Sequence, residues 1–187
     1  MIVAPTPMTP ERLLALPDSK GLEIVAGKLV EKPVGTESNQ IGMRLACFLM
    51  NHCNQHRLGR IVGYECAFQC FPHDPTMVRK PGVAFLSYAK VPASQFIGAY
   101  VKVAPELAIE VLSPNDLYKE ISERVADYLA AGAAQVWVVN GFRRQVEVHT
   151  SQGTKVLSER DELAADDILS GFRCPVSELF VGIPMQE

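Results

Sequence analysis

The sequence predicts a single domain of the α/β class. Two runs, Val78–Leu86 and Leu107–Leu112, are predicted as buried strands, and the second is almost entirely apolar. Helical patterns precede and follow these runs, and this alternation of strands with helices indicates an α/β fold. No repeat, low-complexity segment or linker divides the 187 residues. We therefore expect one domain over residues 1–187, with loose ends at 1–8 and 181–187.

The overall charge does not favour a dedicated nucleic-acid binder. The net charge is −3 and the pI is about 5.8, whereas such proteins are usually basic. A local basic patch is compatible with this total charge. Its candidate residues are Arg79, Lys80, Lys90, Lys102, Arg143 and Arg144. Scattered lysines and arginines are also explained as ordinary solvated surface.

The cysteines and the first residues indicate a cytoplasmic protein. The five cysteines include no C-x-x-C pair. Cys66 and Cys70 fall on one predicted strand, where four residues span about 13 Å, too far for a disulfide. We therefore expect reduced thiols. The chain opens with no basic, apolar leader, and no stretch reaches about 18 apolar residues, so no membrane span is expected.

Two short elements are predicted near the N-terminus. Thr9 and Pro10 are residue types preferred at the N-cap and the first position of a helix. Residues 21–34 contain two β-type runs on either side of an Ala-Gly pair, which predicts a hairpin. Alternation along its first strand places Glu23 on the face opposite its apolar neighbours.

The longest predicted helix spans residues 36–57. Its apolar stripe has the spacing of an amphipathic helix and consists of Ile41, Leu45, Phe48 and Leu49. His52 and His56 extend the stripe by one turn. Histidines at this spacing can bind a metal. No acidic partner lies nearby in the sequence, which favours histidines at the edge of the core.

Strands and helices alternate after residue 58. The predicted elements are strands within Gly59–Phe71, Val78–Leu86 and Leu107–Leu112, a helix ending at Gly132, a strand at Gln135–Val139, and a hairpin of residues 145–149 and 154–157. Ser113, Pro114 and Asn115 are expected to end the central strand and cap the helix. Gly132 is a typical C-cap glycine.

A buried charge pair is the strongest chemical signal in the sequence. Glu110 lies inside an apolar strand, and burying an unpaired carboxylate there is costly unless a cation or strong donors meet it. Arg124 falls on the inward face of the following helix, among its apolar residues. Two explanations are open: a functional site, or a simple Glu110–Arg124 ion pair inside the fold.

Six ordered segments resemble one known family. The segments are GLEIVAGKLVEKP, VRKPGVAFL, APELAIEVLSPND, ERVADYLAAG, QVWVVN and GFRCPVSELF. From about Met8 to Phe180 they are similar to the Uma family of restriction-type endonucleases, which belongs to the superfamily with the PD-(D/E)XK nuclease fold. The resemblance implies a restriction-endonuclease-like α/β fold, with a mixed central sheet flanked by helices and a Mg²⁺ site at one sheet edge.

The resemblance also implies roles for individual residues. The family's hairpin glutamate corresponds to Glu23, and the aspartate of its Pro-Asp pair falls on Gly82. Its Glu-Val-Leu-Ser-Pro motif begins at Glu110, and its catalytic lysine, displaced onto the following helix, corresponds to Arg124. The implied catalytic positions are these four. The implied metal ligands are Glu110, Glu23 and the carbonyl of Val111.

Two of these positions depart from the family pattern. Gly82 supplies no carboxylate, although Mg²⁺ prefers hard oxygen ligands. Arg124 stays protonated, so it is suited to clamp a phosphate but is a poor proton acceptor. Lys80, which would share a strand face with position 82, is a candidate replacement.

The sequence therefore predicts a metal-dependent DNA endonuclease whose cleavage is weak or lost, with at most a weak Mg²⁺ site. The expected partner is double-stranded DNA. A homodimer is expected by analogy with the superfamily, because cutting both strands of a duplex favours two-fold pairing. The alternative is a non-catalytic member that keeps the nuclease fold to bind nucleic acid or protein.

Overall fold

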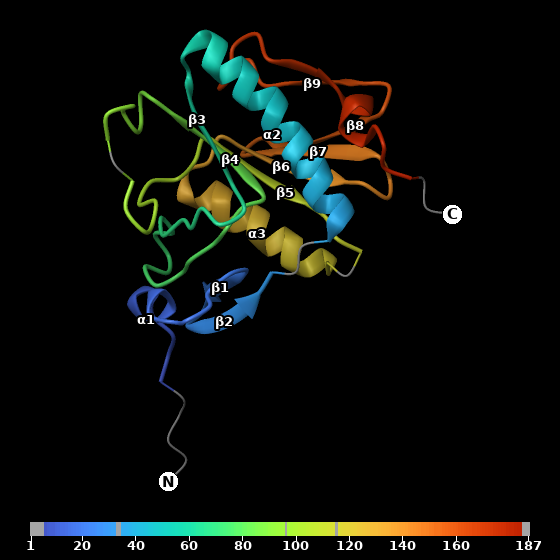
Figure 1. The fold of residues 1–187 in the computed structure, drawn as a ribbon. Helices are drawn as coiled ribbons and strands as arrows, with labels where there is room; N and C mark the ends of the chain where they lie inside the picture. The colour runs from blue at the N-terminus through green and yellow to red at the C-terminus, as the bar shows by residue number, and fades with distance from the viewer. Residues whose placement is uncertain (1–5, 33–34, 96, 115, 185–187) are drawn as a thin grey trace.

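A mixed six-stranded sheet forms the centre of the protein (Figure 1). The computed structural model describes residues 6–32, 35–95, 97–114 and 116–184. The strands, in their order across the sheet, are β3 (Gly59–Gly63), β4 (Val83–Ser87), β5 (Leu107–Val111), β6 (Gln135–Asn140), β7 (Gln145–Thr150) and β8 (Gly153–Ser158). Only β5 and β6 pair in parallel, and the other neighbours are antiparallel.

Two helices cover opposite faces of this sheet. Helix α2 (Thr36–His56) packs on one face, and α3 (Tyr118–Ala131), which connects β5 to β6, packs on the other. Successive residues of a strand point to opposite faces. In β5, Leu107, Ile109 and Val111 therefore join the core under α2, whereas Ala108 joins the core under α3. By the same alternation, Glu110 belongs to the face covered by α3.

An N-terminal unit lies beside the α3 side of the molecule (Figure 1). It consists of helix α1 (Pro10–Leu14) and a separate two-stranded sheet of β1 (Leu22–Val25) and β2 (Lys28–Glu31). Ile24 pairs through its backbone with Val78, at 3.0 Å in both directions. This pairing fixes the hairpin beside the segment that leads into β4.

The C-terminal part closes the core on the α2 side. Strands β9 (Glu162–Ala164) and β10 (Arg173–Pro175) pair with each other, and the 3₁₀ helix η1 (Val176–Phe180) follows. Ile183 is also buried against this core, whereas its neighbours Val181, Gly182 and Pro184 in the predicted loose end 181–187 are exposed. Residues 185–187 lie outside the described ranges.

The predicted strand Val78–Leu86 is wrong in its first half. Val78 and Arg79 make isolated bridges, residues 80–82 are irregular, and regular pairing starts at Val83. The physical reason is Pro81, which has no N–H to donate to a sheet ladder. The predicted Gly59–Phe71 strand similarly ends at Gly63.

The predicted N-terminal boundary of the helix after β5 is also wrong. Helix α3 begins at Tyr118, with Leu117 at the N-cap position and no side-chain cap. Of the expected capping residues, Asn115 lies outside the described residues. The C-terminal prediction is confirmed, because Gly132 is the C-cap with a positive φ of 100°.

All five cysteines are free. Burial raises the pKa of Cys53, Cys66, Cys70 and Cys174 to about 11. Cys66 and Cys70 lie in irregular chain after β3 rather than on one strand. None of the helices within the described ranges is long and apolar enough to cross a membrane.

Candidate functional site

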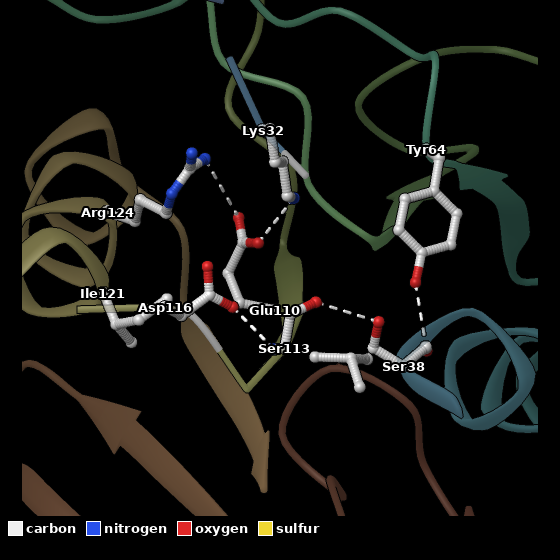
Figure 2. Close-up of a pocket in the computed structure, with 9 residues that line it drawn as sticks. Lys32, Ser38, Tyr64, Glu110, Ser113, Asp116, Ile121 and Arg124 are labelled. Atoms are coloured by element: carbon white, nitrogen blue, oxygen red, sulfur yellow. Dashed lines mark hydrogen bonds and ion pairs between the residues drawn. The ribbon is translucent and has the colours of Figure 1, made fainter. Parts of the chain in front are cut away.

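A small cavity lies at the end of β5, between α3, the start of α2 and the chain that leaves β2 (Figure 2). Its volume is about 10 Å³, room for about one water molecule. The lining residues are Lys32, Ser38, Tyr64, Glu110, Val111, Ser113, Asp116, Ile121 and Arg124. The cavity thus contains three residues predicted for the site: Glu110, Val111 and Arg124.

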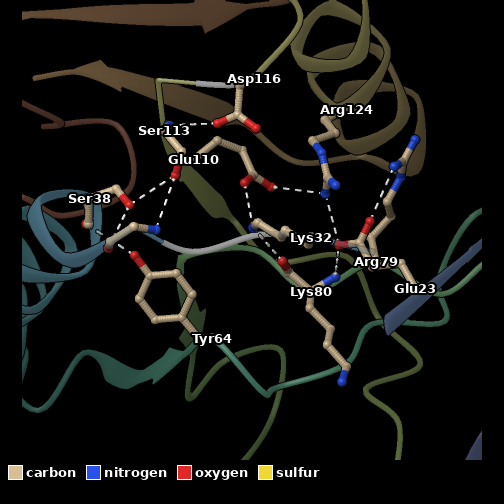
Figure 3. Close-up of polar contacts among 11 residues, drawn as sticks. Glu23, Lys32, Ser38, Tyr64, Arg79, Lys80, Glu110, Ser113, Asp116 and Arg124 are labelled. Carbon is tan, nitrogen blue, oxygen red and sulfur yellow. Dashed lines mark hydrogen bonds and ion pairs between the residues drawn. The ribbon is translucent and has the colours of Figure 1, made fainter. Parts of the chain in front are cut away.

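Buried charged side chains form a cluster at and beside this cavity, joined by polar contacts (Figure 3). Glu23 is 0% exposed, Glu110 is 2% exposed and Arg124 is 6% exposed. They come from β1, β5 and α3, which are far apart in the sequence. The structure therefore brings together three of the four predicted catalytic positions.

Both carboxylate oxygens of Glu23 accept hydrogen bonds from within the protein. Its Oε1 accepts hydrogen bonds from Arg124 Nη1 and from the backbone N–H of Lys80, both at 2.8 Å. Its Oε2 accepts from Arg79 Nη1 at 3.3 Å. Burial by itself would raise the pKa of Glu23, but the nearby cations Arg124, Lys32 and Arg79 outweigh it and hold the pKa below its ordinary value. Glu23 is therefore an ionised carboxylate.

Acidification is expected to remove the stability that Glu23 contributes. Its folded-state pKa lies below the ordinary value of 4.5, so this contribution is fully present above pH 4.5 and is lost as the pH falls through the folded-state pKa. Urea unfolding at a series of pH values should show a steeper loss of unfolding free energy below pH 4.5 in the native protein than in Glu23→Gln. Parallel pH profiles for the two proteins would contradict this expectation.

Glu110 is paired mainly with Lys32. Its Oε2 accepts a hydrogen bond from Lys32 Nζ at 2.6 Å. Its Oε1 lies 3.9 Å from Arg124 Nη1 and has no hydrogen-bond partner within the described part of the chain. The simple Glu110–Arg124 ion pair is therefore not the main contact of either side chain, because the hydrogen bond of Arg124 goes to Glu23.

Arg124 is held as a cation. Burial alone would lower its pKa, but the carboxylates of Glu110 and Glu23 raise it above the ordinary value. A guanidinium in this state cannot accept a proton. Arg124 can neutralise carboxylates or contact an oxyanion, but it cannot act as a base.

Lys32 is a site residue that the sequence did not reveal. Its backbone N–H bonds to the carbonyl of Gly21, which closes the hairpin just after β2. Its ammonium donates to Glu110 and to the carbonyl of Lys80, the latter at 2.7 Å. It also lies 5.9 Å from the centre of the Tyr64 ring. A lysine after an exposed strand carries no sequence signal of burial.

Lys80 does not replace the missing carboxylate or the missing lysine. Its ammonium bonds to Ser19 O at 2.9 Å and to Glu65 Oε2 at 2.6 Å, outside the cavity. The prediction that Lys80 shares a face with Gly82 is wrong because residues 80–82 are not a regular strand. Only the Lys80 backbone serves the cluster, through its N–H to Glu23 and its carbonyl to Lys32.

Gly82 lies against an aromatic ring. A Cβ at this position would be 3.1 Å from the Ile109 carbonyl oxygen and 3.7 Å from the nearest atom of Tyr64. The Tyr64 hydroxyl donates to the carbonyl of Ser38 at 3.1 Å, which holds the ring in place. The side chain nearest to position 82 is therefore aromatic, and sequence reasoning did not anticipate it.

The residues around the cavity do not fit a tight Mg²⁺ site. The carboxylates that line it, Glu110 and Asp116, face two cations, Lys32 and Arg124. One Asp116 oxygen also accepts from the backbone N–H of Ser113 at 2.6 Å. Lys32 and Arg124 would repel a divalent cation placed beside Glu110. Within the described ranges, no three His, Cys, Asp or Glu side chains form a group that could hold a metal.

The family of the chain follows from its sequence. The Uma2 family, described as "Putative restriction endonuclease", matches residues 10–177. The chain belongs to the Uma2 family. This confirms the family resemblance of the six ordered segments. No curated protein matches the chain.

A solved structure shows the same fold as this Uma2 protein. It is the crystal structure of a protein from Anabaena variabilis, described as a putative nuclease belonging to DUF820. The TM-score is 0.80 and the sequence identity is 20%, over 94% of this chain and 98% of the other. The predicted restriction-endonuclease-like α/β fold, with a mixed central sheet and flanking helices, is confirmed.

Proposed function

We propose that this Uma2 protein is a degenerate DNA endonuclease, in which metal-dependent hydrolysis of phosphodiesters is weak or lost. The observation that carries the proposal is the saturation of Glu23. Both of its oxygens accept hydrogen bonds from within the protein, from Arg124, Arg79 and the Lys80 N–H. Mg²⁺ requires oxygen ligands in near-octahedral geometry, and a carboxylate bound in this way is not free to provide one.

The remaining implied ligands support the same proposal. Gly82 contributes no oxygen from a side chain, and Tyr64 borders the space beside it. Of the two predicted carboxylates, only Glu110 keeps an oxygen without a hydrogen-bond partner in the described chain. The Val111 carbonyl and one glutamate, facing two cations, are a poor donor set for Mg²⁺.

Proton transfer is impaired as well. A nuclease must activate a water molecule for attack on the phosphorus atom. Arg124 occupies the implied lysine position but keeps its proton, because Glu110 and Glu23 raise its pKa. Lys80 is bound elsewhere by Ser19 and Glu65. What these two positions retain is positive charge, without a base at the implied lysine position.

Plasmid cleavage in Mg²⁺ or Mn²⁺ tests the proposal. Three proteins should be compared: the native chain, Glu110→Ala, and the double variant Gly82→Asp with Arg124→Lys. We expect the native protein to cut no faster than Glu110→Ala, whose residual rate measures contaminating nuclease. Native cleavage that disappears in Glu110→Ala would refute the proposal. Cleavage gained only by the double variant would place the loss of activity at these two positions.

Double-stranded DNA as the ancestral substrate and a two-fold homodimer belong to this proposal on family grounds. Two of the six residues of the predicted basic strip, Arg79 and Lys80, are 4% and 5% exposed and cannot form part of a surface. A non-catalytic role in binding nucleic acid or protein is the alternative if every folded variant fails to cut. Salt-dependent DNA binding would then indicate nucleic acid as the partner.

A further inference from the structure

The contacts of Lys32 are those of a bound cation. Its ammonium meets a carboxylate oxygen of Glu110 at 2.6 Å and the carbonyl oxygen of Lys80 at 2.7 Å. The face of Tyr64 lies 5.9 Å away on another side. Carboxylate and backbone carbonyl oxygens are also the ligands of hard metal cations in proteins. The side chain of Lys32 is 12% exposed, so little water competes for these contacts.

The ion-paired carboxylates in this region have cationic partners without any added ion, and Asp116 also lines the cavity but makes no ion pair in the described chain. Three carboxylates, Glu23, Glu110 and Asp127, are paired with three cations. The three cations are Lys32, Arg79 and Arg124. A divalent cation added beside Glu110 would bring two positive charges next to the Lys32 ammonium and the Arg124 guanidinium. Removal of Lys32 would leave the Glu110 carboxylate without its main cationic partner.

The ammonium also has the position expected for the family's metal. It is bound to the first residue of the Glu-Val-Leu-Ser-Pro motif, in the cavity that Val111 lines (Figure 2). It is also bound to the carbonyl of residue 80, two residues before Gly82. A metal held by the implied ligands would have to share this small space with Lys32.

We propose that the Lys32 ammonium is a tethered cation that stands in for a metal ion, and that an uncharged side chain at position 32 converts the cavity into a binding site for a divalent cation. The inference rests on the proposed function only for the expected location of the metal. It also explains how a Glu buried to 2% exposure is tolerated. The tether joins the end of the hairpin to β5, 78 residues later.

Thermal unfolding with and without divalent cations tests this proposal. The variants are Lys32→Met and the double variant Lys32→Met with Glu110→Gln, and Lys28→Met is the matched control, because Lys28 is an exposed lysine on the same hairpin. Mg²⁺, Mn²⁺ and Ca²⁺ chlorides should be compared with NaCl at equal ionic strength.

We expect divalent cations to raise the Tm of Lys32→Met and of none of the other proteins compared. Lys32→Met should melt at a lower temperature than the native chain without metal, and its Tm should rise by about 5 °C or more when the metal is about 100-fold above its dissociation constant. The native protein, Lys28→Met and the double variant should show no specific response. A missing response in folded Lys32→Met would overturn the proposal. So would a specific response of the native protein that the double variant lacks.

A second measurement uses the native protein and remains decisive if Lys32→Met fails to fold. Paramagnetic Mn²⁺ broadens NMR signals of nuclei near its binding site. We expect native spectra in which signals around Glu110 broaden no more than those of the exposed surface. Selective broadening around Glu110 would show that a metal displaces the ammonium and would overturn the proposal. Neither measurement uses DNA cleavage, so a failure of the proposed function is recorded separately by the plasmid test.

Discussion

Replacing Glu23 by alanine should lower the free energy of unfolding by about 3–5 kcal/mol. The substitution leaves the guanidinium of Arg124 without its hydrogen-bonded partner and removes one partner of Arg79. It also leaves the buried N–H of Lys80 without its acceptor. Breaking a buried ion pair on one side is strongly destabilising because the remaining charge stays buried and unpaired. Urea denaturation with linear extrapolation measures the change.

The matched control is Glu31→Ala. Glu31 lies on β2 of the same hairpin but is exposed, so its removal should change the unfolding free energy by no more than about 0.5 kcal/mol. Comparable losses of unfolding free energy in Glu23→Ala and Glu31→Ala would show that any change in the hairpin destabilises the protein to the same extent. They would contradict a specific role for the buried carboxylate.

The second large effect is expected for Gly59→Ala, which should destabilise the protein by about 3 kcal/mol or more. A Cβ at Gly59 would overlap the backbone oxygen of Leu86 and lie 2.6 Å from the Phe85 ring. Gly59 pairs with Ser87 at the end of the β3–β4 ladder, so relief of this overlap requires the strands to separate. Thermal and urea unfolding both report the loss.

Gly63→Ala is the control on the same strand. A Cβ there would meet its nearest atom, the Gly82 carbonyl oxygen, at 4.0 Å, which is an ordinary van der Waals distance. Its φ is not positive, so alanine should be neutral or slightly stabilising through the unfolded chain. Equal destabilisation by both substitutions would mean that the intrinsic preference of alanine or glycine for a strand, rather than contact with β4, determines the change in stability.

The central sheet could be predicted because its strands carry a strong local signal. Leu107–Leu112 and Gln135–Val139 are nearly continuous apolar runs, and both appear as buried strands within about one residue. The spacing of apolar residues in α3 likewise placed Arg124 on the buried face, where it is found. In each of these cases, burial can be recognised from the pattern of apolar residues within one element.

The partners of the charges could not be predicted in the same way. Lys32 and Glu110 are 78 residues apart, and Lys32 follows a strand that is largely exposed. Nothing near Lys32 in the sequence distinguishes it from a surface lysine. Its burial arises from the packing of the hairpin against the end of β5, which is a property of the tertiary structure. Tyr64 beside Gly82 was missed for the same reason.

The strand ending at Leu86 shows where local reasoning misleads. The alternation rule placed Lys80 and Gly82 on one face, but it applies only to regular strands. Pro81 interrupts the ladder, and the chain around it turns its backbone groups toward Glu23 and Lys32. The irregular backbone therefore offers its N–H and C=O groups to Glu23 and Lys32, whereas a regular strand would have paired these groups within the sheet.

The β1–β2 hairpin is attached to the rest of the protein through buried charges, which has a consequence for the order of folding during synthesis. Arg124 follows Glu23 by 101 residues, and a ribosome needs about 5–20 s to add that length of chain. Over this interval the Glu23 carboxylate lacks one of its two guanidinium partners, because Arg124 on α3 has not yet been made. The N-terminal hairpin, although made first, therefore docks late. We expect the sheet and its helices to assemble first and the earliest segment of the chain to complete its docking after them.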